Sequence, residues 1–259
     1  MLATWLLAAA VNGSCSTTHP PRLEIATTTS VQNSGLLDAL LPFYREQTGV
    51  DVRVHAAGSG RALQMMDEGL VDLVISHAPG AEARALASHP DWLRRELASN
   101  QFVLVGPPPD PARVRESADA VDAFRRIARS AAPFVSRGDL SGTHERETQL
   151  WEAAGERPPA ARLIVSGRGM ALALRHADEL QGYTLSDEAT FRQLEPELEL
   201  EMVYQGDERL RNVYAVVHPR DDSGAAAFAD WLVSGGGRDR IGAFAIRGRR
   251  MFTLPAVNH

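Results

Sequence analysis

The sequence lacks the features that would place it in several large classes of protein. It has one cysteine in 259 residues, Cys15, so no disulfide can form within the chain. Acidic residues outnumber basic ones, 33 to 27, and the two are interspersed, which argues against a nucleic-acid partner. Beyond residue 11, no apolar run is long enough to cross a bilayer. With a net charge of −6, any site for an anion must be built locally.

The first 21 residues form a segment of their own. Residues 1–11 are apolar, and small polar residues then lead to Cys15, an order typical of an export signal with a lipid attachment site. The start has no Lys or Arg, and Asn12 stands where a lipoprotein signal usually has Leu. The alternative is a buried N-terminal helix with an unused thiol. We predict a signal or lipid-anchor segment and linker over residues 1–21. The location is then periplasmic or extracytoplasmic, with membrane contact only through a lipid on Cys15.

Strand and helix patterns alternate through the rest of the chain, which predicts an α/β fold. The expected strands are 23–26, 50–55, 71–76, 101–106, 133–136, 162–165, 182–187, 198–203 and 213–217. The expected helices are 36–47, 61–68, 117–130, one that ends near Gly155, 171–176, a short one capped at the end of the strand 182–187, 224–232 and 238–244. The proline-rich run 107–111 breaks the pattern and marks a crossing to a second domain. We therefore predict two lobes with a hinge: residues 22–106 plus 209–259 form lobe 1, and residues 107–208 form lobe 2.

The stretch 134–147 is the centre of the functional prediction. A short apolar strand runs into Arg137 and a glycine loop, and a helix follows. Gly138 and Gly142 allow a tight turn and a close approach of the backbone to a ligand. Asp139 or Ser141 can cap the helix, and Glu145 and Glu147 are expected in its first turn. Free backbone N–H groups at such a helix start form a site for an anion.

Further hydroxyl and glycine loops follow other strands of the predicted sheet. In an open α/β sheet, ligands bind beyond the carboxyl ends of the strands, where these loops meet. Hydroxyls, backbone N–H groups and arginines suit a small, fully ionised oxyanion, which accepts hydrogen bonds on every side. The candidate ligand-binding residues are Thr28, Thr29, Ser30, Ser59, Arg137, Ser141, Gly142, Thr143 and Arg168.

The patterns expected of an enzyme are missing. Ser141 and His144 are close in the sequence, but no nucleophile-elbow pattern surrounds them. His144 and Glu147 have the spacing of a metal pair, but a third ligand is lacking. The sequence also has no phosphate-loop Gly-Lys-Ser and no full dinucleotide fingerprint. We predict a protein that is not an enzyme, with no catalytic residue, no cofactor and no resident metal ion.

Four blocks of the sequence together resemble the substrate-binding proteins of bacterial tungstate ABC transporters, which have the type II periplasmic-binding-protein fold. The blocks are 26–37, 58–79, 134–147 and 167–187. The resemblance implies an interlobe ligand cleft, capture of tungstate, and delivery to a membrane permease that works with a cytoplasmic ATPase. It assigns the anion to Thr28, Ser30, Ser59, Arg137, Ser141 and Thr143.

The resemblance leaves some alternatives open. Molybdate is nearly isosteric with tungstate, and phosphate would need an acceptor for its proton, which Asp139 could supply. Sulfate, an enzyme on the same fold, and the sensing domain of a regulator are further alternatives. Three positions depart from the family pattern: Ser59 replaces a common Thr, Arg168 stands where a neutral polar residue is expected, and Asn212 is not followed by proline.

Overall fold

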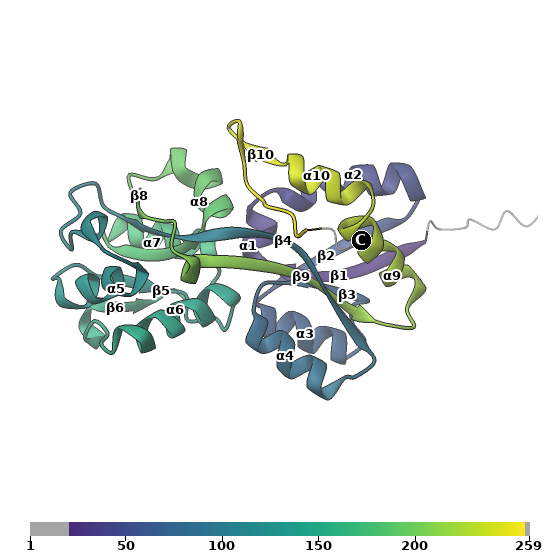
Figure 1. Cartoon of the computed structure of the whole chain (residues 1–259), viewed down its shortest axis with the longest axis horizontal. Coiled ribbons are helices and arrows are strands. Elements are labelled where there is room, and N and C mark those ends of the chain that lie inside the picture. The colour runs from purple at the N-terminus through teal and green to yellow at the C-terminus, as the bar shows by residue number, and fades with distance from the viewer. Residues whose placement is uncertain (1–20, 257–259) are drawn as a thin grey trace, which may run out of the picture.

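The computed structural model describes residues 21–256. They form two α/β lobes that lie side by side and are joined by two long strands (Figure 1). The predicted signal segment, apart from Pro21, and the lipid site at Cys15 fall outside the described residues. Within residues 21–256, no helix is long and apolar enough to cross a membrane.

Lobe 1 is built on three parallel strands, β1 (Arg22–Thr28), β2 (Asp51–Ala57) and β3 (Leu73–Ser76), in the order β2-β1-β3. The helices α2 (Leu36–Thr48), α9 (Ser223–Val233) and α10 (Gly236–Ala243) cover one face, and their apolar residues share a core with β1 and β3. The helices α3 (Ser59–Asp67) and α4 (Pro79–Ser88) cover the other face around a second core. Covering both faces removes the sheet from water, as parallel strands require.

Lobe 2 repeats this layered plan. The strands β5 (Phe134–Ser136), β6 (Leu163–Val165) and β7 (Tyr183–Asp187) are parallel, and β8 (Glu201–Tyr204) pairs with β4. The helices α5 (Ala120–Arg129) and α6 (Gly142–Ala154) enclose one core. The helices α7 (Met170–Glu179) and α8 (Glu188–Leu194) enclose the other. The remaining short elements are α1 (Thr29–Asn33), β10 (Ala245–Ile246), β11 (Arg249–Arg250) and the 3-10 turns Val114–Glu116, Ala160–Arg162, Glu195–Glu197 and Glu208–Leu210.

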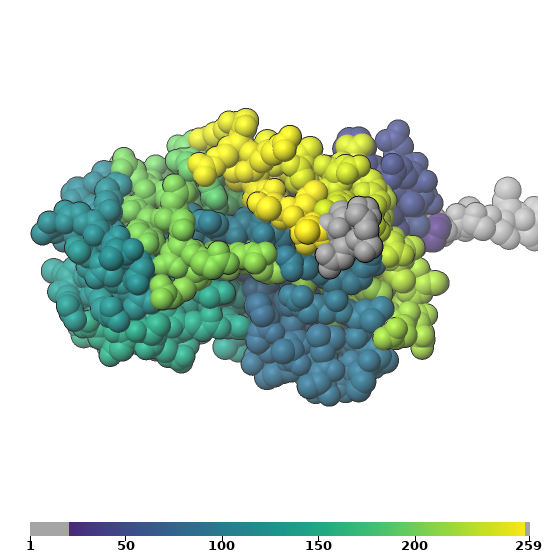
Figure 2. Space-filling view, in the orientation of Figure 1, coloured from purple at the N-terminus to yellow at the C-terminus, as the bar shows by residue number. Residues whose placement is uncertain are grey.

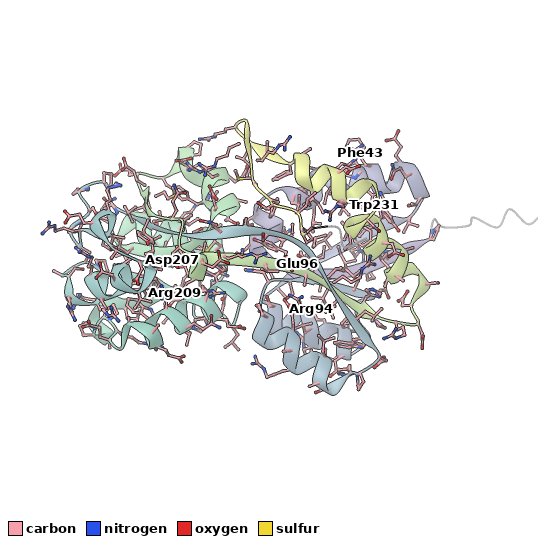
Figure 3. All side chains as sticks on the ribbon, viewed as in Figure 1. Phe43, Arg94, Glu96, Asp207, Arg209 and Trp231 are labelled. Carbon is pink, nitrogen blue, oxygen red and sulfur yellow. The ribbon has the colours of Figure 1, made fainter. Side chains whose placement is uncertain are left out.

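The two lobes share the strands β4 (Trp92–Gly106) and β9 (Arg211–Pro219), which run antiparallel to each other. The first part of β4 pairs with β9, and from Phe102 onward β4 pairs with β7. Figure 3 shows Arg94 and Glu96 along β4 on the lobe 1 side, and Asp207 and Arg209 beside lobe 2. The chain just before β9 lies on the surface of lobe 2 (Figure 2), where Asp207 accepts a hydrogen bond from the Ala120 N–H at the start of α5. We propose that the chain changes lobe within β4, near Gln101, and within β9, near Asn212, instead of at residues 106 and 209.

Most predicted elements are present within a few residues of the expected bounds, and four features differ. The helices α1 and α4 and the hairpin β10–β11 were not expected, and β4 begins at Trp92 rather than at Gln101. The start of β4 escapes detection because Arg94, Arg95 and Glu96 interrupt the apolar pattern of a strand. The prediction for Glu147 was wrong: α6 begins at Gly142, so only Glu145 lies in its first turn.

Candidate anion-binding site

Four helices begin at the junction of the lobes, two from each lobe. The N-cap residues are Thr28 for α1 and Gly58 for α3 in lobe 1, and Ser141 for α6 and Gly169 for α7 in lobe 2. The starts of α3, α6 and α7 follow the glycine-rich segments that the sequence predicted, whereas α1 begins directly at the hydroxyl residues that end β1. The N-termini leave backbone N–H groups without partners inside the helix, and these favour negative charge.

The lobes touch at these helix starts, so the structure is a closed form. A Cβ atom on Gly58 would lie 2.9 Å from the carbonyl oxygen of Asp139 in the opposite lobe. A Cβ on Gly169 would lie 3.3 Å from Thr29 Oγ1, again across the junction. A Cβ on Gly142 would lie 2.1 Å from the carbonyl oxygen of His77. Glycine is therefore required at Gly58 and Gly142, because a side chain would hold the lobes apart.

Several buried polar atoms at this junction have no hydrogen-bond partner among the described residues. Besides His77 Nε2 and Ser166 Oγ, they are the four atoms Ser30 Oγ, Ser59 Oγ, Thr143 Oγ1 and Arg137 Nε. Proteins rarely leave buried donors unpaired, since each unpaired group costs about 1–3 kcal/mol. All four atoms come from residues that the sequence nominated for anion binding. A group of donors from both lobes matches an anion that only accepts hydrogen bonds.

Arg137 is the largest fully buried side chain in the described part of the chain. Its Nη2 donates to Asp139 Oδ2 at 2.5 Å, and its Nη1 donates to Met170 Sδ at 3.2 Å. Its backbone N–H donates to Glu147 Oε2 at 3.0 Å, and burial raises the pKa of Glu147. Because Nη1 and Nη2 already donate to protein atoms, Nε is the nitrogen of the guanidinium that remains free, within the described chain, to donate to a ligand.

The other predicted residues fall into two groups. Thr28 Oγ1 and Ser141 Oγ accept backbone hydrogen bonds from the first turns of their own helices, and Ser141 also lies beside Asp139. Thr29 is partly buried at the contact with Gly169, and Gly142 is the first residue of α6. These positions keep Thr28, Thr29, Ser141 and Gly142 at the junction with the buried donors.

Arg168 is placed differently from the other predicted residues. It is exposed, and no hydrogen bond or ion pair of its side chain occurs among the described residues. The positive φ angles of Gly167 and Gly169, 67° and 88°, turn the loop on either side of it. This placement argues against a direct role at the site. From the same loop, Ser166 has a buried Oγ without a partner in the described chain, and the sequence analysis did not nominate it.

Sequence reasoning also missed a buried polar network beside the site. His77 Nδ1 lies 3.0 Å from Asn212 Oδ1, and Asn212 Nδ2 donates to Asp187 Oδ2 at 2.9 Å. Asn100 Nδ2 and the Tyr214 hydroxyl also donate to that oxygen. Burial lowers the pKa of His77, which keeps the ring neutral at pH 7. The network joins the end of β3, both crossing strands and the end of β7, so it fixes the lobes around the site.

The geometry gives no support to nucleophilic catalysis by Ser141. Ser141 Oγ accepts from the backbone N–H of His144, and His144 Nδ1 lies 3.1 Å from the backbone nitrogen of Leu140. Burial lowers the pKa of His144. Within residues 21–256, no group of three or more His, Cys, Asp and Glu side chains could hold a metal ion.

The closed contact at Gly58 provides a direct test of the site. We expect Gly58→Ala to weaken oxyanion binding about tenfold, because the added Cβ forces Asp139 and the loop between Arg137 and Ser141 to shift by a few tenths of an ångström. The measurement is a calorimetric titration with tungstate. Gly60→Ala is the matched control, since a Cβ on Gly60 of the same helix meets no atom within 4 Å. Equal affinities of the two variants would contradict closure at Gly58.

Comparisons with known proteins agree with this arrangement. The PBP superfamily domain matches residues 16–235. The tungstate-binding protein TupA of Peptoclostridium acidaminophilum is 36% identical over 93% of this chain and 91% of its own length. A putative ABC transporter anion-binding protein of Haloferax volcanii is 38% identical over 91% of this chain and 72% of its own.

Solved structures extend the comparison. The structure described as the tungstate ABC transporter from Geobacter sulfurreducens has a TM-score of 0.79 and 34% identity, and covers 86% of this chain and 98% of that one. The tungstate-binding protein TupA from Desulfovibrio alaskensis G20 has a TM-score of 0.76 and 35% identity, and covers 92% and 100%. The predicted fold and the predicted family resemblance are confirmed: the chain belongs to the PBP superfamily and is similar to its tungstate-binding members.

Proposed function

We propose that this protein captures tungstate between its two lobes outside the cytoplasm and delivers it to the permease of an ABC transporter. The observation that carries the proposal is the set of buried, unpartnered donors at the lobe junction, on Ser30, Ser59, Arg137 and Thr143 within the described chain. The names of the relatives support the choice of ligand. The protein then acts as a receptor and not as an enzyme, and it needs no cofactor.

The arrangement around Asp139 disfavours phosphate. At neutral pH phosphate carries a proton and needs an acceptor, whereas tungstate and molybdate are fully ionised. Asp139 was the candidate acceptor, but Arg137 Nη2 and the backbone N–H of Ser141 already donate to its two oxygens. Although burial opposes ionisation, these groups hold the pKa of Asp139 below its ordinary value. Each oxygen of this ionised carboxylate thus already accepts one hydrogen bond from the protein, which makes it a poorer acceptor for the proton of phosphate.

Molybdate remains the closest rival ligand. Its shape and charge match those of tungstate, so the same hydroxyl, N–H and guanidinium donors fit both anions. Selectivity between them then depends on small differences in donor geometry within the closed site. Sulfate is smaller and would leave some of the donors at hydrogen-bond distances that are too long.

The proposal is tested by calorimetric titration of the domain from residue 20 onward with tungstate, molybdate, sulfate and phosphate. We expect tight binding of tungstate and much weaker binding of sulfate and phosphate. Small-angle scattering should show a more compact protein with tungstate than without it. If the protein binds none of the four anions, the proposed function is wrong, and assays for an enzyme on this fold become the next experiment.

The proposed location and partners follow from the same role. The protein would act in the periplasm or on the outer side of the cytoplasmic membrane, attached there through a lipid if Cys15 is modified. Its partners would be a membrane permease and the cytoplasmic ATPase that powers it. Mass spectrometry of the protein purified from membranes would reveal a lipid on Cys15, and Cys15→Ser should abolish the attachment.

A further inference from the structure

A hydrogen bond joins the lobes between α6 and the first turn of α4. The Gly80 N–H of lobe 1 donates to Glu145 Oε1 of lobe 2, with the two atoms 3.0 Å apart. We propose that Glu145 is a closure residue, which stabilises the closed form and slows release of the anion without contacting the anion. This inference rests on the proposed function, because it supposes that an anion is held between the lobes.

Within the described chain, no side chain of lobe 1 accepts from the Gly80 N–H in the first turn of α4. The N-cap residue is Ala78, whose side chain cannot accept a hydrogen bond, and the first helical residue is Pro79, which has no N–H. Glu82 could reach back, but its Oε1 already accepts from Ser76 Oγ and from the Ala78 N–H. Among the described residues, the acceptor for the Gly80 N–H is therefore the carboxylate of the opposite lobe.

The two contacting surfaces are shaped for each other. A Cβ atom on Gly80 would lie 2.8 Å from Glu145 Oε1 and 3.2 Å from Glu145 Cδ, so the carboxylate rests directly on the glycine. The helix N-terminus favours the negative charge of Glu145. Gln149 Nε2, one turn further along α6, lies 3.5 Å from the same oxygen and limits its movement.

The contact is coupled to the anion site through the start of α6. Glu145 is two residues beyond Thr143, and its backbone N–H donates to the carbonyl oxygen of Ser141 at 2.9 Å. Gly80 is three residues beyond His77, whose carbonyl oxygen faces Gly142 across the junction. The bond can form only when the start of α6 lies against lobe 1. A contact made only in the closed form adds to ligand affinity, although it touches no ligand.

The test compares Glu145→Ala with Glu152→Ala. Glu152 lies two turns later on α6 and is exposed. We expect Glu145→Ala to raise the Kd for tungstate about 3- to 10-fold, the effect of removing one helix cap. The change should appear in the dissociation rate measured by stopped flow, with little change in the association rate. Without tungstate, the melting temperature should equal that of the wild type, since the contact is absent from the open form.

A second variant separates closure from any general effect of changing α6. Gly80→Ala puts a methyl group in the place of the Glu145 carboxylate and leaves α6 unchanged, and it should weaken binding by a similar factor. The double variant Gly80→Ala/Glu145→Ala should bind no more weakly than Glu145→Ala alone, because both changes remove the same bond.

The outcomes are distinct. If the wild type binds tungstate and Glu145→Ala binds equally well, the closure role of Glu145 is excluded while the proposed function stands. Additive effects in the double variant would also overturn it, because they would show that the two residues act separately. If the wild type itself binds none of the tested oxyanions, the proposed function is wrong. The titration of the wild type shows this before any variant is compared with it.

Discussion

Arg137→Ala is expected to weaken tungstate binding at least about a thousandfold. Arg137 is fully buried at the junction, and its Nε has no partner in the described chain. A hydrogen bond between charged groups in such a place contributes about 1.5–3 kcal/mol, and breaking a buried charge pair costs about 3–5 kcal/mol. The variant also leaves the Asp139 carboxylate without its cation, so that a second negative charge faces the anion. A loss of about 4 kcal/mol is a factor of about a thousand in Kd.

The controls separate binding from folding. Arg175→Ala removes a surface arginine of the same lobe, which forms an ion pair with Glu197, and it should leave Kd unchanged. Arg137→Ala/Asp139→Ala removes the cation and the carboxylate together, and it should bind tungstate more tightly than Arg137→Ala. Circular dichroism and thermal melting establish that each variant is folded. Tight binding by a folded Arg137→Ala would remove Arg137 from the site.

The local part of the site could be predicted from the sequence. Glycine and hydroxyl residues directly after an apolar strand specify a loop and a helix start, and the signal lies within a few residues. For this reason the loops at Ser30, Ser59 and Thr143 were nominated, and the structure brings them together at the junction. The order of strands and helices followed from periodicity for the same reason.

The direction of single side chains could not be predicted, because it depends on the backbone of each loop. Arg168 carried the charge that attracted attention, but the left-handed glycines on both sides leave it exposed. The start of β4 was missed because Arg94 masks the strand pattern, and its buried partner, Glu82, lies twelve residues away on α4. The contact between His77 and Asn212 spans 135 residues, beyond the reach of any local pattern.

Asp187→Asn is expected to lower stability by about 3 kcal/mol, which corresponds to a fall of about 6–12 °C in the melting temperature. Asp187 Oδ2 accepts from Asn100 Nδ2 at 2.8 Å, from Asn212 Nδ2 at 2.9 Å and from the Tyr214 hydroxyl. Its Oδ1 accepts from the Thr190 N–H at 3.0 Å and caps α8. In the variant, an NH₂ group replaces either Oδ1 or Oδ2 and faces donors from which it cannot accept. The remaining carbonyl oxygen is neutral, so the hydrogen bonds that it accepts are weaker than those to a carboxylate.

The size of this effect depends on where Asp187 lies. It is fully buried at the end of β7 and binds side chains of both crossing strands, so its loss affects both lobes at once. Asp221→Asn is the matched control, because Asp221 is exposed in the turn after β9 and should change the melting temperature by no more than about 2 °C. A similarly small change in Asp187→Asn would mean that the neutral amide satisfies the same donors. The carboxylate charge would then contribute nothing to holding the crossing strands, and the junction would depend on apolar packing and on the contacts between the helix starts.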